Sequence, residues 1–236
     1  MPHWAREEIQ GIEKDMSAYF ARPRRLRFAG SRLRWAERQV FAAVELIDKV
    51  WSEAAAEINL LVRDVVLLTG GAIESSTAMA TFGAIYICPQ PRWLPAYYVE
   101  TLLHETAHHS FPLRAAVVDF LRNPSVLVRS PFRRDLRPLA ILLEAAFVLA
   151  RGTHGLARLL ESRACPREAE TRRFFVRWRE KFGQALITLF ETARWTSLGE
   201  RLFRSLRDCY SDLPSSVDIF STARPQKSPH QKSLLV

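Results

Sequence analysis

Apolar residues recur every three or four positions along most of the chain, which is the pattern of helices that bury one face. In the segment 32–58, for example, Leu33, Val40 and Ile47 fall on one helical stripe. Pro112 is expected to end one helix and Pro138 to begin another. The helices expected from this pattern cover about residues 4–20, 32–58, 95–110, 114–121, 138–150 or beyond, 167–194 and 197–209.

Two short runs depart from the helical period. Residues 65–68 are β-prone and end at Gly70-Gly71, and residues 82–87 form a second β-prone run that ends at Pro89. These runs predict a mainly α fold with a small antiparallel β-sheet, an α+β class. We expect residues 1–60 to form a helical segment that packs on the core, residues 61–212 to form the domain that carries the chemistry, and residues 213–236 to form a flexible polar tail.

Composition agrees with a globular protein, since 48% of the 236 residues are hydrophobic and 25% are charged. The N-terminal residues lack the apolar segment of a signal peptide, and no apolar run reaches the roughly 18–20 residues of a membrane span. The three cysteines are far apart and form no Cys-x-x-Cys pair. We therefore expect a cytoplasmic protein with no membrane partner.

The chain carries a net charge of +9, almost all of it from arginine. Arginines gather in the segments 22–38 and 129–137, and such a surface could bind nucleic acid or another anion without catalysis. A basic non-catalytic binding module is therefore one alternative function. No nucleic-acid motif accompanies the charge, so nucleic acid is not the expected partner.

The strongest chemical signal is the pentapeptide His104-Glu105-Thr106-Ala107-His108 within an expected helix. Residues four apart share one helical face, so His104 and His108 can bind the same metal ion. Glu105 can then act as general base toward a metal-bound water. One divalent metal is expected, with zinc as first choice; the alternative is a pair of surface histidines on an amphipathic helix.

A third ligand is expected at Glu144, which interrupts the apolar run 139–149. A buried carboxylate needs a metal or a cation beside it, so an arginine such as Arg151 is the alternative partner. His109 and His154 are weaker candidates for a ligand, because His109 points about 100° away from His108 around the helix.

Other residues are candidates for substrate binding. Tyr97 shares a face with His104 and, like Tyr86, could donate to a developing oxyanion, although ordinary packing explains either ring. The strand that contains Ala84 and Tyr86 precedes the motif helix and is expected to align an extended peptide by β-augmentation. The arginines before the Glu144 helix could bind a carboxylate or remain a solvated loop; they are Arg133, Arg134 and Arg137.

The segment from about Glu74 to Arg151 resembles the HExxH-motif domain family of peptide-modification proteins, whose active site is zincin-like. That family is found in bacterial gene neighbourhoods for ribosomally made, post-translationally modified peptides. The residues that carry the resemblance are Ser75-Ser76, Phe82-Gly83-Ala84-Ile85-Tyr86, the pentapeptide, Ser130-Pro131-Phe132-Arg133 and Asp135-x-Arg137-Pro138-Leu139. Together they cover about a third of the chain.

The family pattern has a His at the position of Glu144, so the resemblance implies a metal-related residue there and a two-His-one-carboxylate site. Such a site suits zinc hydrolysis and also oxygen activation by iron(II). The first expectation is zinc-activated water that hydrolyses a peptide or amide bond. The resemblance implies the alternative, iron(II)- and 2-oxoglutarate-dependent hydroxylation of a precursor peptide, with Arg133, Arg134 or Arg137 on the co-substrate and other maturation enzymes as candidate partners.

Overall fold

The computed structural model of the chain describes residues 7, 10, 27–28, 33–70, 74–131, 135–162 and 165–215. The described part is mainly helical and contains one four-stranded sheet and one two-stranded sheet, so the predicted fold class is confirmed. Most of the expected helix 4–20, much of the basic segment 22–38 and the tail from residue 216 lie outside the described residues.

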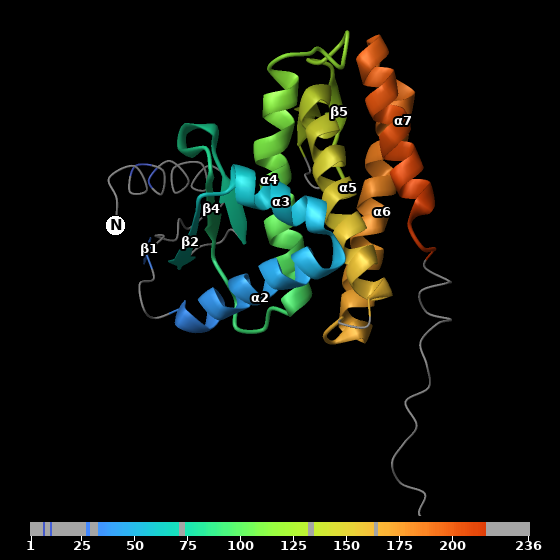
Figure 1. Ribbon diagram of the computed structural model, residues 1–236. Helices are drawn as coiled ribbons and strands as arrows, with labels where there is room; N and C mark the ends of the chain where they lie inside the picture. Colours follow the sequence, from blue (N-terminus) through green and yellow to red (C-terminus); the bar gives the residue numbers. More distant parts are fainter. Residues whose placement is uncertain are drawn as a thin grey trace, which may run out of the picture.

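The elements follow one another as Figure 1 shows. The helices are α2 (Arg34–Val50), α3 (Ser52–Leu61), α4 (Pro95–Ala115), α5 (Leu139–Glu161), α6 (Glu168–Thr192) and α7 (Ser197–Asp212). The strands are β1 (Arg27–Phe28), β2 (Asp64–Thr69), β3 (Ser75–Thr77), β4 (Ala84–Ile87), β5 (Leu127–Arg129) and β6 (Leu136–Pro138), with a short 3-10 turn at Met79–Thr81 before β4.

The larger sheet is mixed rather than purely antiparallel, with strand order β1-β2-β4-β3. The two strands expected from the sequence, β2 and β4, lie parallel, with Val65 opposite Ile85. The short strand β3 was not expected; it lies between them in the chain and pairs antiparallel with the far side of β4. After β2 the chain crosses the position that β4 later fills and forms β3 beyond it. It then reverses direction into β4, so β4 lies between β2 and β3 and runs parallel to β2.

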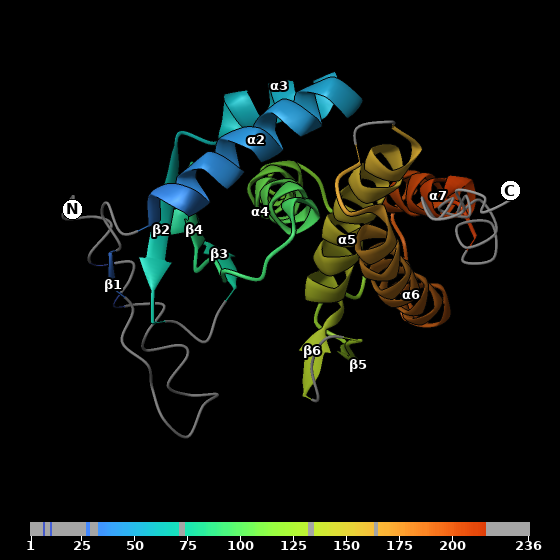
Figure 2. The ribbon, with the colours of Figure 1, turned by 90° about the horizontal axis from the view of Figure 1, so that it is seen from below.

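Helix α4 occupies the centre of the fold, as the view along its axis in Figure 2 shows. Helices α2 and α3 lie across one side of it, the sheet lies on a second side and α5 on a third. The helix continues through Pro112 to Ala115, and the expected separate helix 114–121 is absent. Pro112 lacks the N–H that would reach the His108 carbonyl, so α4 loses one hydrogen bond near its end, while the Pro112 carbonyl accepts from the Ala116 N–H at 2.8 Å.

The expected helix 32–58 is two helices, because the backbone becomes extended at Trp51 (φ −157°, ψ 76°). Val40 and Ile47 of α2 belong to the same hydrophobic core as Leu102 and Leu143. Helices α2 and α3 are therefore part of the core around α4.

Helix α5 runs without interruption from Leu139 to Glu161, through Gly152 and Gly155. The glycines permit close approach to α4: a Cβ added at Gly155 would lie 2.1 Å from Leu103 Cδ1. By length and composition α5 is also long and apolar enough to cross a membrane, but 61% of that stretch is buried inside the protein. Its apolar character is therefore explained by packing against α4 and α6.

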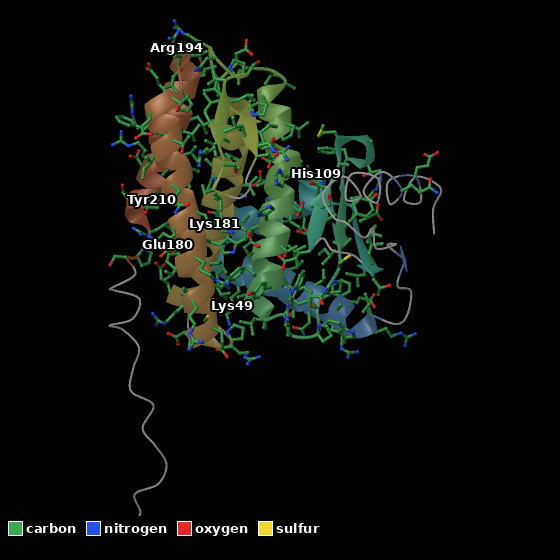
Figure 3. The ribbon with its side chains drawn as sticks, turned by 180° about the vertical axis from the view of Figure 1, so that it is seen from behind. Lys49, His109, Glu180, Lys181, Arg194 and Tyr210 are labelled. Atoms are coloured by element: carbon green, nitrogen blue, oxygen red, sulfur yellow. The ribbon has the colours of Figure 1, made fainter. Side chains whose placement is uncertain are left out.

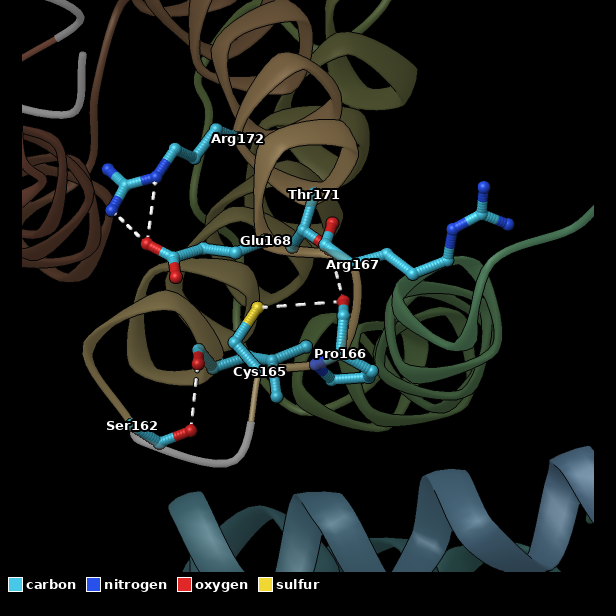
Figure 4. A network of polar contacts seen from close by, with 8 residues as sticks. Ser162, Cys165, Pro166, Arg167, Glu168, Thr171 and Arg172 are labelled. Carbon is cyan, nitrogen blue, oxygen red and sulfur yellow. Dashed lines mark hydrogen bonds and ion pairs between the residues drawn. The ribbon is translucent and has the colours of Figure 1, made fainter. Parts of the chain in front are cut away.

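The start of α6 is fixed by a local network, which Figure 4 shows. Arg167 precedes the helix in the left-handed conformation (φ 51°), and the Thr171 hydroxyl donates to the carbonyls of Pro166 and Arg167 at 3.2 and 3.3 Å. The guanidinium of Arg172 forms an ion pair with Glu168 one turn earlier. These contacts are all local to the first two turns of α6.

We predict that Gly155→Ala destabilises the protein by about 1–3 kcal/mol, because the buried Leu103 side chain must move. Alanine by itself favours a helix over glycine by roughly 1 kcal/mol, so the sign of the change separates the two effects. Chemical denaturation of the single variants and of Leu103→Ala/Gly155→Ala gives the coupling. In the Leu103→Ala background the alanine at 155 should cost less; equal costs in both backgrounds would contradict the close contact.

Candidate metal centre

The two motif histidines are the partly exposed positions in the central, otherwise buried segment of α4. From Tyr98 to Phe111 every residue of α4 is buried except His104 and His108. Their side chains are 25% and 31% exposed. This pattern differs from that of an amphipathic surface helix, in which a whole face is polar and exposed.

Both histidines line one cavity of about 320 Å³. Its other walls are Ser130 and Arg137, which flank or belong to the β5–β6 hairpin, and five apolar residues of α5: Ile141, Leu142, Ala145, Val148 and Leu149. The motif therefore faces a partly apolar hollow between α4, the start of α5 and the hairpin.

Each imidazole is held by a carboxylate through the same ring nitrogen. The Nδ1–H of His104 donates to Glu100 Oε1 at 3.1 Å, and the Nδ1–H of His108 donates to Glu144 Oε1 at 2.8 Å. A proton on Nδ1 leaves the Nε2 lone pair of a neutral imidazole available to a metal. Carboxylates in this position orient metal-binding histidines and increase their basicity.

The spacing of the rings fits a shared metal ion. The ring centroids of His104 and His108 lie 5.0 Å apart with the planes at 61°. Two imidazoles bound through Nε2 to a tetrahedral zinc at roughly 2.0–2.1 Å would have their centres roughly 5 Å apart. The donor set of the two histidines therefore fits such an ion.

The expected third ligand, Glu144, lies beside the two histidines. Among the described residues, no group of three or more His, Cys, Asp and Glu side chains is placed to hold a metal ion. Glu144 does reach the site, but it contacts the Nδ1 of His108, the nitrogen that a metal bound at Nε2 does not use. In this arrangement Glu144 is a supporting carboxylate rather than a ligand.

Glu100 is a site residue that the sequence analysis missed. It is 5% exposed, lies one turn before His104 on the same helical face, and is packed under Gly152 of α5. A Cβ at position 152 would lie 3.0 Å from Glu100 Oε1, so the glycine leaves room for the carboxylate. The signal in the sequence was a glutamate four residues before the first motif histidine, a spacing that brings two side chains together on a helix.

The charge of Glu100 changes the titration of His104. Burial disfavours the imidazolium, but the neighbouring Glu100 carboxylate and its hydrogen bond raise the pKa of His104 from 6.5 to about 8. A metal must therefore displace a proton from this site at neutral pH.

Glu105 lies on the side of α4 that faces the sheet. It is 3% exposed, and its Oε1 accepts a hydrogen bond from the hydroxyl of Ser75 on β3. The edge strand β3 thus contacts the residue that follows the first motif histidine. Sequence reasoning did not identify this pair, since thirty residues separate its members.

Ala84 and Tyr86 are both fully buried in β4, which is paired with β2 on one side and with β3 on the other. A strand paired on both sides cannot accept a further strand, so the expected substrate strand is not β4. His109 takes part in this packing, since its Nε2–H donates to the Ala84 carbonyl at 3.3 Å. Figure 3 shows His109 between α4 and the sheet, so it is placed to tie the two together rather than to bind a metal.

Of the other residues that the sequence analysis singled out, only some line the cavity. Tyr97 does not line the histidine cavity; its ring stacks on Phe174 at 4.1 Å and its hydroxyl accepts from Arg177. Arg137 does line the cavity and pairs with Asp135 at 2.8 Å, whereas Arg133 and Arg134 lie outside the described residues. His154 packs against Trp51 at 4.7 Å and contributes nothing to the cavity lining.

A search of protein-family models finds no match to this chain, and no curated protein matches it.

We predict that Glu100→Gln weakens zinc binding by roughly 10- to 100-fold, the usual effect of losing a carboxylate that holds a metal-binding histidine. Competition with a chromophoric chelator at fixed pH measures the affinity. Glu180→Gln, an exposed glutamate on α6, is the matched control and should bind zinc like the unmodified protein. An unchanged affinity in Glu100→Gln would show that this carboxylate does not support the metal.

Proposed function

We propose that this protein is a metal-dependent enzyme that hydrolyses a peptide or amide bond, with His104 and His108 as zinc ligands and Glu105 as general base. One observation carries the proposal: between Tyr98 and Phe111 helix α4 is buried except at the two motif histidines, and a carboxylate contacts the Nδ1 of each, which leaves each Nε2 for a metal. Glu100 is 5% exposed, and a buried carboxylate at this place needs a cation near it, which a metal ion bound by His104 would provide once the imidazole has lost its proton.

The roles of the residues follow from their positions. A bound zinc ion would supply a Lewis acid and lower the pKa of a water to about 7. Glu105 would accept the proton of the attacking water on a carboxylate oxygen and pass it to the departing amine. The Ser75 hydroxyl, which donates to Glu105 Oε1, would hold that carboxylate in place.

The edge strand β3 supports a peptide as the substrate. It pairs with β4 on one side only, and it is the outermost described strand of the sheet on the side of α4. An extended peptide can add to such an edge through backbone hydrogen bonds. The contact between Ser75 and Glu105 brings this edge next to the general base.

We predict that Glu105→Gln lowers hydrolysis by several orders of magnitude and leaves the zinc content unchanged. The amide has nearly the same shape as the carboxylate but cannot accept the proton. Mass spectrometry of a defined peptide pool measures cleavage, and elemental analysis measures zinc. Glu53→Gln, which changes an exposed glutamate on α3, serves as the control; near-normal cleavage by Glu105→Gln would overturn the hydrolase assignment.

A second activity, iron(II)- and 2-oxoglutarate-dependent hydroxylation of a peptide side chain, is supported by Arg137. Its side chain lines the same cavity as His104 and His108, where a guanidinium can bind a co-substrate carboxylate. Under this activity we predict that protein purified without oxygen or added metal contains iron, and that 2-oxoglutarate and oxygen add one oxygen atom to a peptide. Arg137→Gln should then raise the KM for 2-oxoglutarate, whereas about one equivalent of zinc would favour hydrolysis.

A further inference from the structure

A second cavity, of about 310 Å³, lies between the start of α4 and the outer face of α6. Three arginines line it: Arg92 before α4, and Arg173 and Arg177 on α6. The rings of Trp93 and Tyr97 form part of the same wall and stack with their centroids 6.0 Å apart. Arginine beside flat rings is a usual setting for the binding of planar anions.

The lining of this cavity has three arginines and two glutamates, so its positive charge is only partly balanced. Glu170 lies at its border, but it pairs with Arg167 at 3.1 Å. No described acidic group forms an ion pair with Arg92, Arg173 or Arg177, and Glu74 is the other acidic residue of the lining. Arg173 and Arg177 are also four residues apart on one helix, a spacing at which like charges destabilise a helix.

The cavity lies on the same side of α4 as the candidate metal centre. Tyr97, in its wall, precedes His104 by seven residues, which corresponds to about 10 Å along a helix. Aromatic rings join the two sites, since Tyr97 stacks on Phe174, and Trp178 packs edge-on against His104 at 5.7 Å. The chain also connects them, because Glu74 of the lining precedes Ser75, which contacts Glu105.

We propose that the cavity bordered by Arg92, Arg173 and Arg177 binds a carboxylate of the peptide substrate. An extended peptide advances about 3.3 Å per residue, so this carboxylate lies about three residues from the bond acted on. It belongs to an acidic side chain or to the C-terminus of the peptide. The inference rests on the proposed function for its choice of substrate, and it assigns to that substrate a required negative charge.

The test is the binding of three peptides, each labelled at its N-terminus with an electrically neutral fluorophore, to chelator-treated protein, measured by fluorescence anisotropy at low salt. All three share one Gly-Ser-Gln sequence; the first is amidated and uncharged, the second has a free C-terminal carboxylate, and the third is amidated with one internal glutamate. The protein should bind the second or third peptide at least roughly tenfold more tightly than the first, as expected for a charge-assisted contact. Which of them binds more tightly identifies the source of the carboxylate.

The variant Arg173→Gln/Arg177→Gln should lose this preference for a charged peptide. Its matched control is Arg34→Gln/Arg38→Gln, a pair of exposed arginines with the same four-residue spacing on α2, which should keep it. Arg173→Glu/Arg177→Glu should instead prefer a peptide with one internal lysine, a gain that loss of folding cannot produce. Equal binding of all peptides, or a preference that survives in the first variant or disappears in the control, would overturn the proposal.

This measurement requires neither metal nor turnover. If hydrolysis fails but the preference is found, the carboxylate site stands and the reaction proposed above is at fault. If metal-dependent cleavage occurs without any preference, the carboxylate site alone is refuted.

Discussion

The burial of helix α4 from Tyr98 to Phe111 is the constraint on which the rest of this structure depends. A helical segment that is buried on nearly all sides must have apolar or satisfied polar groups at nearly every position. The sheet covers the side that carries His109, helices α2 and α3 cover another, and α5 covers the side where Leu103 meets Gly155. The chain is mainly helical because several helices are needed to surround the central one.

Three polar residues of α4 take their partners from three different elements. Glu105 is matched to Ser75 of β3, Ser110 to Glu57 of α3, and His108 to Glu144 of α5. Arg151 of α5 joins the contact at Glu57, so one carboxylate links three helices. The candidate metal centre is thus assembled by the same contacts that hold the layers together, and its geometry follows from the packing of the fold.

Much of this arrangement could be read from the sequence, because it depends on local periodicity. The limits of α6 and α7, the start of α5 after Pro138 and the strands β2 and β4 follow from apolar spacing and from proline and glycine. The pairing of His104 with His108 follows from the helical repeat. What the sequence could not provide was the tertiary partner of each group: β3 is too short and polar to predict, and the choice of Nδ1 by Glu144 depends on how α5 lies against α4.

The burial of the helix that carries the motif also limits how such a protein can evolve toward a new substrate. Nearly every residue of α4 touches a neighbouring layer, so the helix that carries the metal-binding pair has almost no positions at which a substitution is free of structural cost. New specificities must therefore arise in the elements that surround the two exposed histidines, namely β3, the β5–β6 hairpin and the outer face of α6. Chemistry and selectivity are then encoded by separate parts of the chain, and the second can diversify while the first stays constant.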